Sequence, residues 1–132
     1  MSRKPIQKKI REQVYKKYNG HCAYCGCQLE YKDMQVDHVI SVYGNDGSND
    51  LDNLMPSCRM CNFYKSTFSI EVFRKNLLTL HERLQKTFIY RLALKYGLVS
   101  EHKSNVVFYF EKEKENDWRK NWYINWDVSK ST

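Results

Sequence analysis

The sequence predicts an α+β protein whose core is held together by a metal site. Its 132 residues suffice for one domain with a modest hydrophobic core. Helical patterns lie before and after a central segment of strand and loop patterns, and a Cys-x-x-Cys pair lies at each end of that segment. We expect a core with a leading basic helix over residues 1–68. A helical and β extension over residues 69–132 should pack on the same domain.

The first element is a helix from Pro5 to Tyr18. Apolar residues recur every four positions from Ile6 to Tyr18, Pro5 suits a first helical turn, and Gly20 suits the end. The remaining face is almost entirely basic or amide-bearing. Its candidate DNA contacts are Lys4, Lys8, Lys9, Arg11, Lys16 and Lys17.

The central segment predicts a β-hairpin followed by a loop and a helix. Strands are expected near residues 28–31 and 34–40. The run VYGNDGSND is rich in turn residues and predicts a polar loop. LDNLMPSC is expected to be a short turn or helical piece, and a helix should begin at Asn62.

The extension predicts a long amphipathic helix from Ser69, a plausible N-cap, with a second piece that ends at Gly97. A strand is expected over residues 105–112. The apolar stripe of the helix consists of Phe73, Leu77, Leu80, Leu84 and Phe88. Aromatic residues of the tail, which pack on a core more often than they bind bases, are Trp118, Trp122, Tyr123 and Trp126.

The two cysteine pairs predict a structural zinc site. The pairs are Cys22 with Cys25 and Cys58 with Cys61, and each can offer two thiolates to one tetrahedral ion. A thioredoxin-like redox pair is the alternative, but two matched pairs without a βαβ pattern argue against it. Such a site contributes on the order of 10 kcal/mol to folding at neutral pH. Cys27 is left over as a packed or partly exposed thiol, and His21 is expected beside the site rather than in it.

The charge pattern favours a nucleic acid as partner. The net charge is +7, with a net of +6 over residues 1–20, −4 over residues 21–50 and +5 over residues 51–100. A basic frame around an acidic patch suits a protein that binds phosphates and holds a cation between them. The alternative is an ordinary basic surface. No secretion signal or membrane-spanning run is visible, so we expect a cytoplasmic protein without membrane contact.

Three polar positions are interlocked with the cysteines. The run VDHVIS places Asp37 and His38 at the end of an apolar strand. Asn53 follows His38 by 15 residues, and Asn62 follows Asn53 by nine, directly behind the last cysteine. An Asp-His dipeptide alone is a weak signal, whereas this combined spacing is specific.

The run from Cys22 to Lys65 resembles the HNH nucleases, which share a ββα-metal core. The matching pieces are CAYC, VDHVIS, DNLMPSC and CRMCNFYK. Parts outside this run look similar to small phage and mobile-element members. The last family position is Asn62 rather than histidine, as in the HNH domains of CRISPR effector nucleases. An amide oxygen there suits a hard cation such as Mg²⁺.

The resemblance implies a role for each residue in phosphodiester hydrolysis to 5′-phosphate and 3′-hydroxyl ends. His38 would be the base that activates water, and Asp37 and Asn62 would hold Mg²⁺ or Mn²⁺. Asn53 would act from the loop by bonding the backbone so that His38 points correctly. Neighbours on a regular strand point to opposite faces, so the strand must end or bulge at Asp37 and His38. Lys65 shares a helical face with Asn62 and is a candidate phosphate contact, as is Arg59 nearby.

A DNA-binding module that contains zinc but has no cleavage activity is the alternative function. The sequence does not separate restriction, packaging, mobile-element and toxin roles, and it leaves open a packaging or defence partner. One such site cuts one strand, so double-strand cutting needs a homodimer or two sequential nicks.

Overall fold

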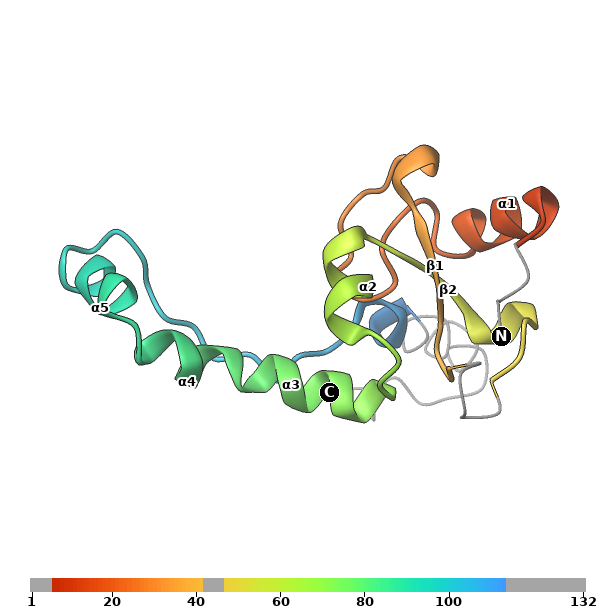
Figure 1. The fold of residues 1–132 in the computed structure, drawn as a ribbon. Helices are drawn as coiled ribbons and strands as arrows, with labels where there is room; N and C mark the ends of the chain where they lie inside the picture. Colours follow the sequence, from red (N-terminus) through yellow and green to blue (C-terminus); the bar gives the residue numbers. More distant parts are fainter. Residues whose placement is uncertain (1–5, 42–46, 114–132) are drawn as a thin grey trace, which may run out of the picture.

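The computed structural model describes residues 6–41 and 47–113 (Figure 1). Figure 1 shows α1, a two-stranded sheet and α2 close together, while α3, α4 and α5 lead away from them. No helix in the described ranges is long and apolar enough to cross a membrane. The elements are α1 (Lys8–Lys17), η1 (Tyr31–Asp33), β1 (Gln35–His38), η2 (Leu51–Asn53), β2 (Leu54–Ser57), α2 (Arg59–Lys65), α3 (Ile70–Leu78), α4 (Leu80–Gln85) and α5 (Phe88–Lys95).

The expected first helix is present as α1. Val14 is fully buried in the core, and Ile6, Ile10 and Tyr18 pack against it, which confirms the period-four pattern. The chain leaves the helix through Gly20, whose φ of 79° is one that glycine adopts without strain.

The sheet pairs β1 with β2 in antiparallel register, with Asp37 opposite Met55 and His38 opposite Leu54. The strand expected over residues 28–31 is wrong, since that segment leads into the 3₁₀ turn η1. The true partner strand lies in the LDNLMPSC segment, behind the 3₁₀ turn η2. Its Pro56 is tolerated because both strands of a two-stranded sheet are edges, and the Pro56 carbonyl accepts a hydrogen bond from the Ala23 N–H (2.8 Å).

Helix α2 begins at Arg59, three residues before the expected start. Cys58 is its N-cap, and the Cys58 sulfur accepts a hydrogen bond from the Cys61 N–H (3.4 Å). A predicted metal ligand therefore also fixes the beginning of the helix that carries Asn62.

An aromatic cluster joins the extension to the core. Phe73 of α3 stacks on Phe108 with ring centroids 5.1 Å apart, and Tyr24 meets both rings edge-on. The strand expected over residues 105–112 is wrong: the segment is irregular up to Phe108, and residues 109–113 are helical. The Phe108 N–H donates to the Glu111 carboxylate (2.9 Å) and caps this turn. A hydrogen bond from Arg74 lowers the pKa of Glu111.

The long helix expected from Ser69 is divided into α3, α4 and α5. The Ser69 hydroxyl accepts a hydrogen bond from the Val72 N–H (3.2 Å), which confirms the predicted cap, and Gly97 follows the last turn with a φ of 71°. Phe73 and Leu77 of the predicted stripe reach the core, whereas Leu80, Leu84 and Phe88 remain exposed. The tail aromatics lie outside the described residues.

Candidate active site and metal centre

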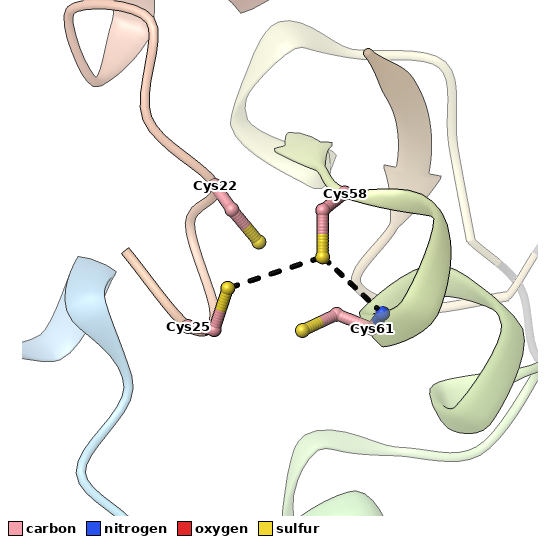
Figure 2. A group of neighbouring side chains, drawn as sticks. All are labelled: Cys22, Cys25, Cys58 and Cys61. Carbon is pink, nitrogen blue, oxygen red and sulfur yellow. Dashed lines mark hydrogen bonds between the residues drawn. The ribbon is translucent and has the colours of Figure 1, made fainter. Parts of the chain in front are cut away.

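Four cysteine sulfurs converge as the sequence predicts. The Sγ atoms of Cys22, Cys25, Cys58 and Cys61 all lie within 4.8 Å of one another (Figure 2). Four sulfurs at zinc-bond length would be roughly 3.8 Å apart in a tetrahedron, and the Cys25 and Cys58 sulfurs are 3.9 Å apart. The group therefore fits one tetrahedral metal ion.

The electrostatics of the group favour a cation. The Cys61 thiol donates a hydrogen bond to Cys22, which lowers the pKa of Cys22 to about 4 and raises the pKa of Cys61. Partial desolvation of the sulfur raises the pKa of Cys27 to about 12, and a hydrogen bond with Cys25 adds to this effect. Cys27 is exposed and lies outside the group of four. His21 is also outside it, because its ring stacks on Tyr109 and its Nδ1 meets the Tyr18 carbonyl.

Backbone hydrogen bonds place the two cysteine pairs. The first pair sits on a tight turn, in which the Cys22 N–H donates to the Cys27 carbonyl (2.8 Å) and Gly26 takes a φ of 83°. The bond from Ala23 to Pro56 fastens this turn to β2, directly before Cys58. The metal site thus joins the segment behind α1 to the β2–α2 junction.

Asp37 is buried between two polar partners. Its Oδ2 accepts a hydrogen bond from the Tyr24 hydroxyl (2.5 Å) and lies 3.0 Å from the Lys65 ammonium. Asp37 is 5% exposed and Lys65 is 0% exposed. Burial and the neighbouring Asp37 carboxylate raise the pKa of Tyr24.

Lys65 does not lie on the surface, as a phosphate contact would require. Its ammonium pairs with Asp37 and also donates to the His38 carbonyl (3.0 Å). The predicted face shared by Asn62 and Lys65 turns Lys65 inward, toward β1. These contacts hold in place the end of β1, which carries the predicted active-site residues Asp37 and His38.

His38 is the last residue of β1. Both Asp37 and His38 are paired with β2 in regular register, so the strand does not bulge between them, and the His38 ring has a different partner from that of Asp37. The residue is 5% exposed, and the Nε2 of its ring lies 2.7 Å from the Asn49 Oδ1. Since an amide oxygen only accepts, Nε2 carries a proton in this contact, and Nδ1 is then the basic nitrogen of the neutral ring. Asn49 was missed by sequence reasoning. Its only signal was its place in the polar loop between His38 and Asn53.

Asn53 fastens the two ends of that loop together. Its Oδ1 accepts a hydrogen bond from the Ile40 N–H (2.8 Å), and its Nδ2 donates to the carbonyls of Ile40 (2.9 Å) and Ser48 (2.8 Å). Its own carbonyl accepts from the Val39 N–H (2.9 Å). These bonds hold the backbone directly after His38.

Replacing Asn53 with alanine is expected to lower the free energy of unfolding by about 2 kcal/mol, because three side-chain hydrogen bonds are lost. Asn53→Asp is the matched control, since it keeps the acceptor for Ile40 but loses both donated bonds. Urea unfolding followed by circular dichroism should rank the variants as wild type, Asp, then Ala. Equal midpoints for wild type and Asn53→Ala would contradict the role of this side chain.

Asn62 and Arg59 lie on α2. Asn62 is half-buried, one helical turn before Lys65, and Arg59 is exposed. Residues three apart share a helical face, and on that face Lys65 touches Asp37 of β1. Among the described residues, no hydrogen bond engages the Asn62 side chain, so its amide oxygen is available to a cation.

The candidate DNA contacts on α1 differ in their surroundings. Lys8, Lys9 and Lys16 are exposed. Lys17 is half-buried, and its ammonium donates to the carbonyls of Leu51 (2.8 Å) and Leu54 (2.9 Å). Burial lowers the pKa of Lys17. Arg11 is used similarly, since it donates to the carbonyls of Tyr31 and Met34 (both 2.8 Å), and Lys4 lies outside the described residues.

Comparisons with known proteins show which proteins this chain resembles. Residues 22–68 match the family model described as HNH endonuclease. The CRISPR-associated endonuclease Cas9 of Corynebacterium diphtheriae is 30% identical over 66 residues, which are 50% of this chain and 6% of that protein. YoqL of Bacillus subtilis, an SPbeta prophage-derived protein whose name assigns it to the HNH endonucleases, is 31% identical over 65 residues. The match covers 41% of this chain and 26% of YoqL.

A solved structure is also similar, the Type II-C Cas9 enzyme from Actinomyces naeslundii, with 26% identity and a TM-score of 0.47. The match covers 56% of this chain and 8% of that one. The chain therefore spans a small part of its relatives. The matched residues include all four cysteines together with Asp37, His38, Asn53 and Asn62, so residues 22–68 of this chain resemble an HNH endonuclease domain.

Proposed function

We propose that the chain is a metal-dependent DNA endonuclease of the cytoplasm that hydrolyses phosphodiester bonds to 5′-phosphate and 3′-hydroxyl ends. The observation that carries the proposal is the placement of Asp37 and His38. Both residues lie at the end of β1. The loop that follows them is held closed by Asn53, and Lys65 of α2, the helix that also carries Asn62, contacts them from the other element. We further propose that the four-cysteine site holds zinc in a structural role. The prophage-derived relative supports an origin in phage or another mobile element.

His38 is the general base in this proposal. A neutral imidazole accepts a proton from water near neutral pH, and general-base catalysis of this kind contributes about 10²–10⁴-fold. The Nε2–H bond to Asn49 holds the ring in the tautomer whose Nδ1 accepts the proton. Asn53 keeps the backbone behind His38 in place, so the ring does not have to be ordered during the reaction.

Asp37 and Asn62 would hold the catalytic Mg²⁺ or Mn²⁺. Carboxylate and amide oxygens are ligands that such hard cations prefer. A bound cation would stabilise the charge that develops on the phosphate and on the leaving oxygen. The Lys65 ammonium, 3.0 Å from the Asp37 Oδ2, holds that carboxylate in place.

Exposed cations on two elements would bind the DNA backbone. Lys8, Lys9 and Lys16 of α1 and Arg59 of α2 are the exposed candidates. Phosphate contacts release counterions, so DNA affinity should fall steeply as salt is raised. Lys17 and Lys65 contribute less directly, because the protein itself binds their ammonium groups.

Cleavage of supercoiled plasmid tests the proposal. The zinc-loaded protein with Mg²⁺ or Mn²⁺ is expected to convert plasmid to nicked or linear DNA, and His38→Ala should reduce the rate at least about 100-fold. Lys32→Ala, a change on the 3₁₀ turn η1, serves as the matched control and should cut at the wild-type rate. Zinc content and the circular dichroism spectrum establish that each variant is folded.

Two outcomes would contradict the nuclease. Cutting that survives in His38→Ala would remove His38 as the base. A wild-type protein that shifts plasmid on a gel but never cuts it, with either metal, would instead be a DNA-binding module that contains zinc.

A further inference from the structure

Helix α5 is apolar over far more of its surface than one neighbour can cover. Its sequence, FIYRLALK, contains only two charged residues, Arg91 and Lys95. At 100° per residue, the apolar side chains of α5 and Tyr96 span roughly 240° of the helix circumference, whereas a helix on a protein surface needs an apolar stripe of about 100°. A helix of this composition is normally buried on two sides.

One side of α5 is already used within the chain. Tyr90, Ala93 and Leu94 are half-buried. The Tyr90 ring lies against His81 of α4, and its hydroxyl meets the Glu101 carboxylate (3.3 Å). The Leu98 N–H also returns to the Ala93 carbonyl (2.9 Å). This side therefore holds α5 against α4 and the returning segment.

The other side is exposed. We call it the outer stripe; its residues, with their exposed fractions, are Phe88 (67%), Ile89 (78%), Leu92 (41%), Tyr96 (73%) and Leu98 (78%). Phe88, Leu92 and Tyr96 are spaced by four, and Ile89 lies beside them on the helix surface. A contiguous apolar patch of this kind marks an interaction surface rather than ordinary scatter.

The helices that carry the stripe cannot be stable by themselves. α4 has six residues, α5 has eight, and neither contains a fully buried residue. Isolated helices shorter than about 12 residues are marginal in water. Figure 1 shows α4 and α5 at the far end of the extension from the sheet, so residues 22–68 do not cover the stripe. Within residues 6–41 and 47–113, no element covers the stripe.

We propose that the outer stripe binds the outer stripe of a second copy of this chain. The five stripe residues, exposed by 41–78%, offer an area on the order of the 800 Å² per partner that a standard interface buries. Two helical hairpins packed face to face give the four-helix arrangement that buries such stripes in soluble proteins. A two-fold contact uses the same patch on both copies and closes on itself, and it is the commonest form of oligomer.

The dimer has a consequence that rests on the proposed function. Each copy brings one His38 centre, so a pair brings two centres to a duplex that has two strands. The stripe lies on the extension, away from the residues of the candidate site, and both centres stay accessible.

Light scattering on the full chain tests the dimer. The wild-type protein is expected to show twice the chain mass of 15.9 kDa. Ile89→Arg should raise the dimer dissociation constant at least about 30-fold, since a charge then enters the centre of the contact from both sides. Phe63→Arg is the matched control, because Phe63 is an equally bare apolar residue (83% exposed) on α2, and it should leave the mass unchanged. Circular dichroism checks that both variants fold.

Hydrogen exchange keeps the test decisive if Ile89→Arg does not fold. The amides of α5 in the wild-type protein should become more protected as its concentration rises from about 1 to 100 µM, the range in which a dimer of micromolar affinity forms. A monomer across this range overturns the proposal. Concentration-independent protection of α5 in a monomer would show that the chain covers its own stripe. A monomer that still cuts plasmid would contradict the dimer but not the nuclease. A dimer that never cuts would contradict the nuclease but not the dimer.

Discussion

Removal of the metal from the four-cysteine site is expected to unfold the sheet and α2. Metal binding to such a site contributes on the order of 10 kcal/mol at neutral pH, which is as large as the whole stability of a typical domain. The fully or nearly buried apolar core is small, with ten residues in the described ranges, and Cys22 is one of them. Cys58 also caps α2, so loss of the metal frees both a ligand and a helix start.

Chelation followed by circular dichroism measures this effect. Helical signal should fall when a zinc chelator is added and return when Zn²⁺ is restored. Cys61→Ser should bind metal weakly and resemble the chelated protein, whereas Cys27→Ser should keep one metal per chain and the wild-type melting temperature. A cooperative melt of the metal-free protein within a few degrees of the loaded one would contradict the structural role.

Lys65→Met is expected to destabilise the protein by about 3–5 kcal/mol, because the Asp37 carboxylate is left buried without its ion-pair partner. The ammonium is fully buried, 3.0 Å from both the Asp37 Oδ2 and the His38 carbonyl. Methionine fills a similar volume, so the loss reflects charge rather than a cavity. Urea unfolding followed by circular dichroism gives the change in the free energy of unfolding.

A double-mutant cycle separates the ion pair from packing. Asp37→Asn removes the charge that Lys65→Met leaves unpaired, so the double variant should be more stable than Lys65→Met alone. Both single variants should also lose plasmid cleavage, since Asp37 is a proposed cation ligand. A Lys65→Met protein as stable as wild type would show that the buried pair does not hold β1 against α2.

Sequence reasoning found the elements with strong local patterns and missed those that depend on distant contacts. The period-four pattern of α1 and the Ser69 cap of α3 are local, and both are confirmed. β2 was missed because four residues containing Pro56 carry little strand signal, and its strand character comes from pairing with β1. Residues 105–112 have a strong strand propensity, but stacking of Phe108 on Phe73 places the segment differently.

The residues of the candidate site were likewise predicted where the sequence signal is local and missed where it depends on distant contacts. Cysteine spacing alone located the candidate metal site, because two matched Cys-x-x-Cys pairs can together offer four thiolates to one ion. Lys65 was expected on the surface, where lysines usually lie. Only the fold shows that Asp37 is close enough to pair with it. Asn49 gave no signal beyond its place in the polar loop, since its contact with His38 depends on how the loop closes.

The link between the two cysteine pairs also bears on how fast the chain folds. In the unfolded chain, 32 residues separate Cys25 from Cys58, and closing a loop of this length costs entropy before any long-range contact compensates for it. An ion captured by one pair and then joined by the other would close that loop early. β1 and β2 would then meet as neighbours rather than by a long search. Metal supply during synthesis would therefore govern the yield of folded protein as well as its final stability.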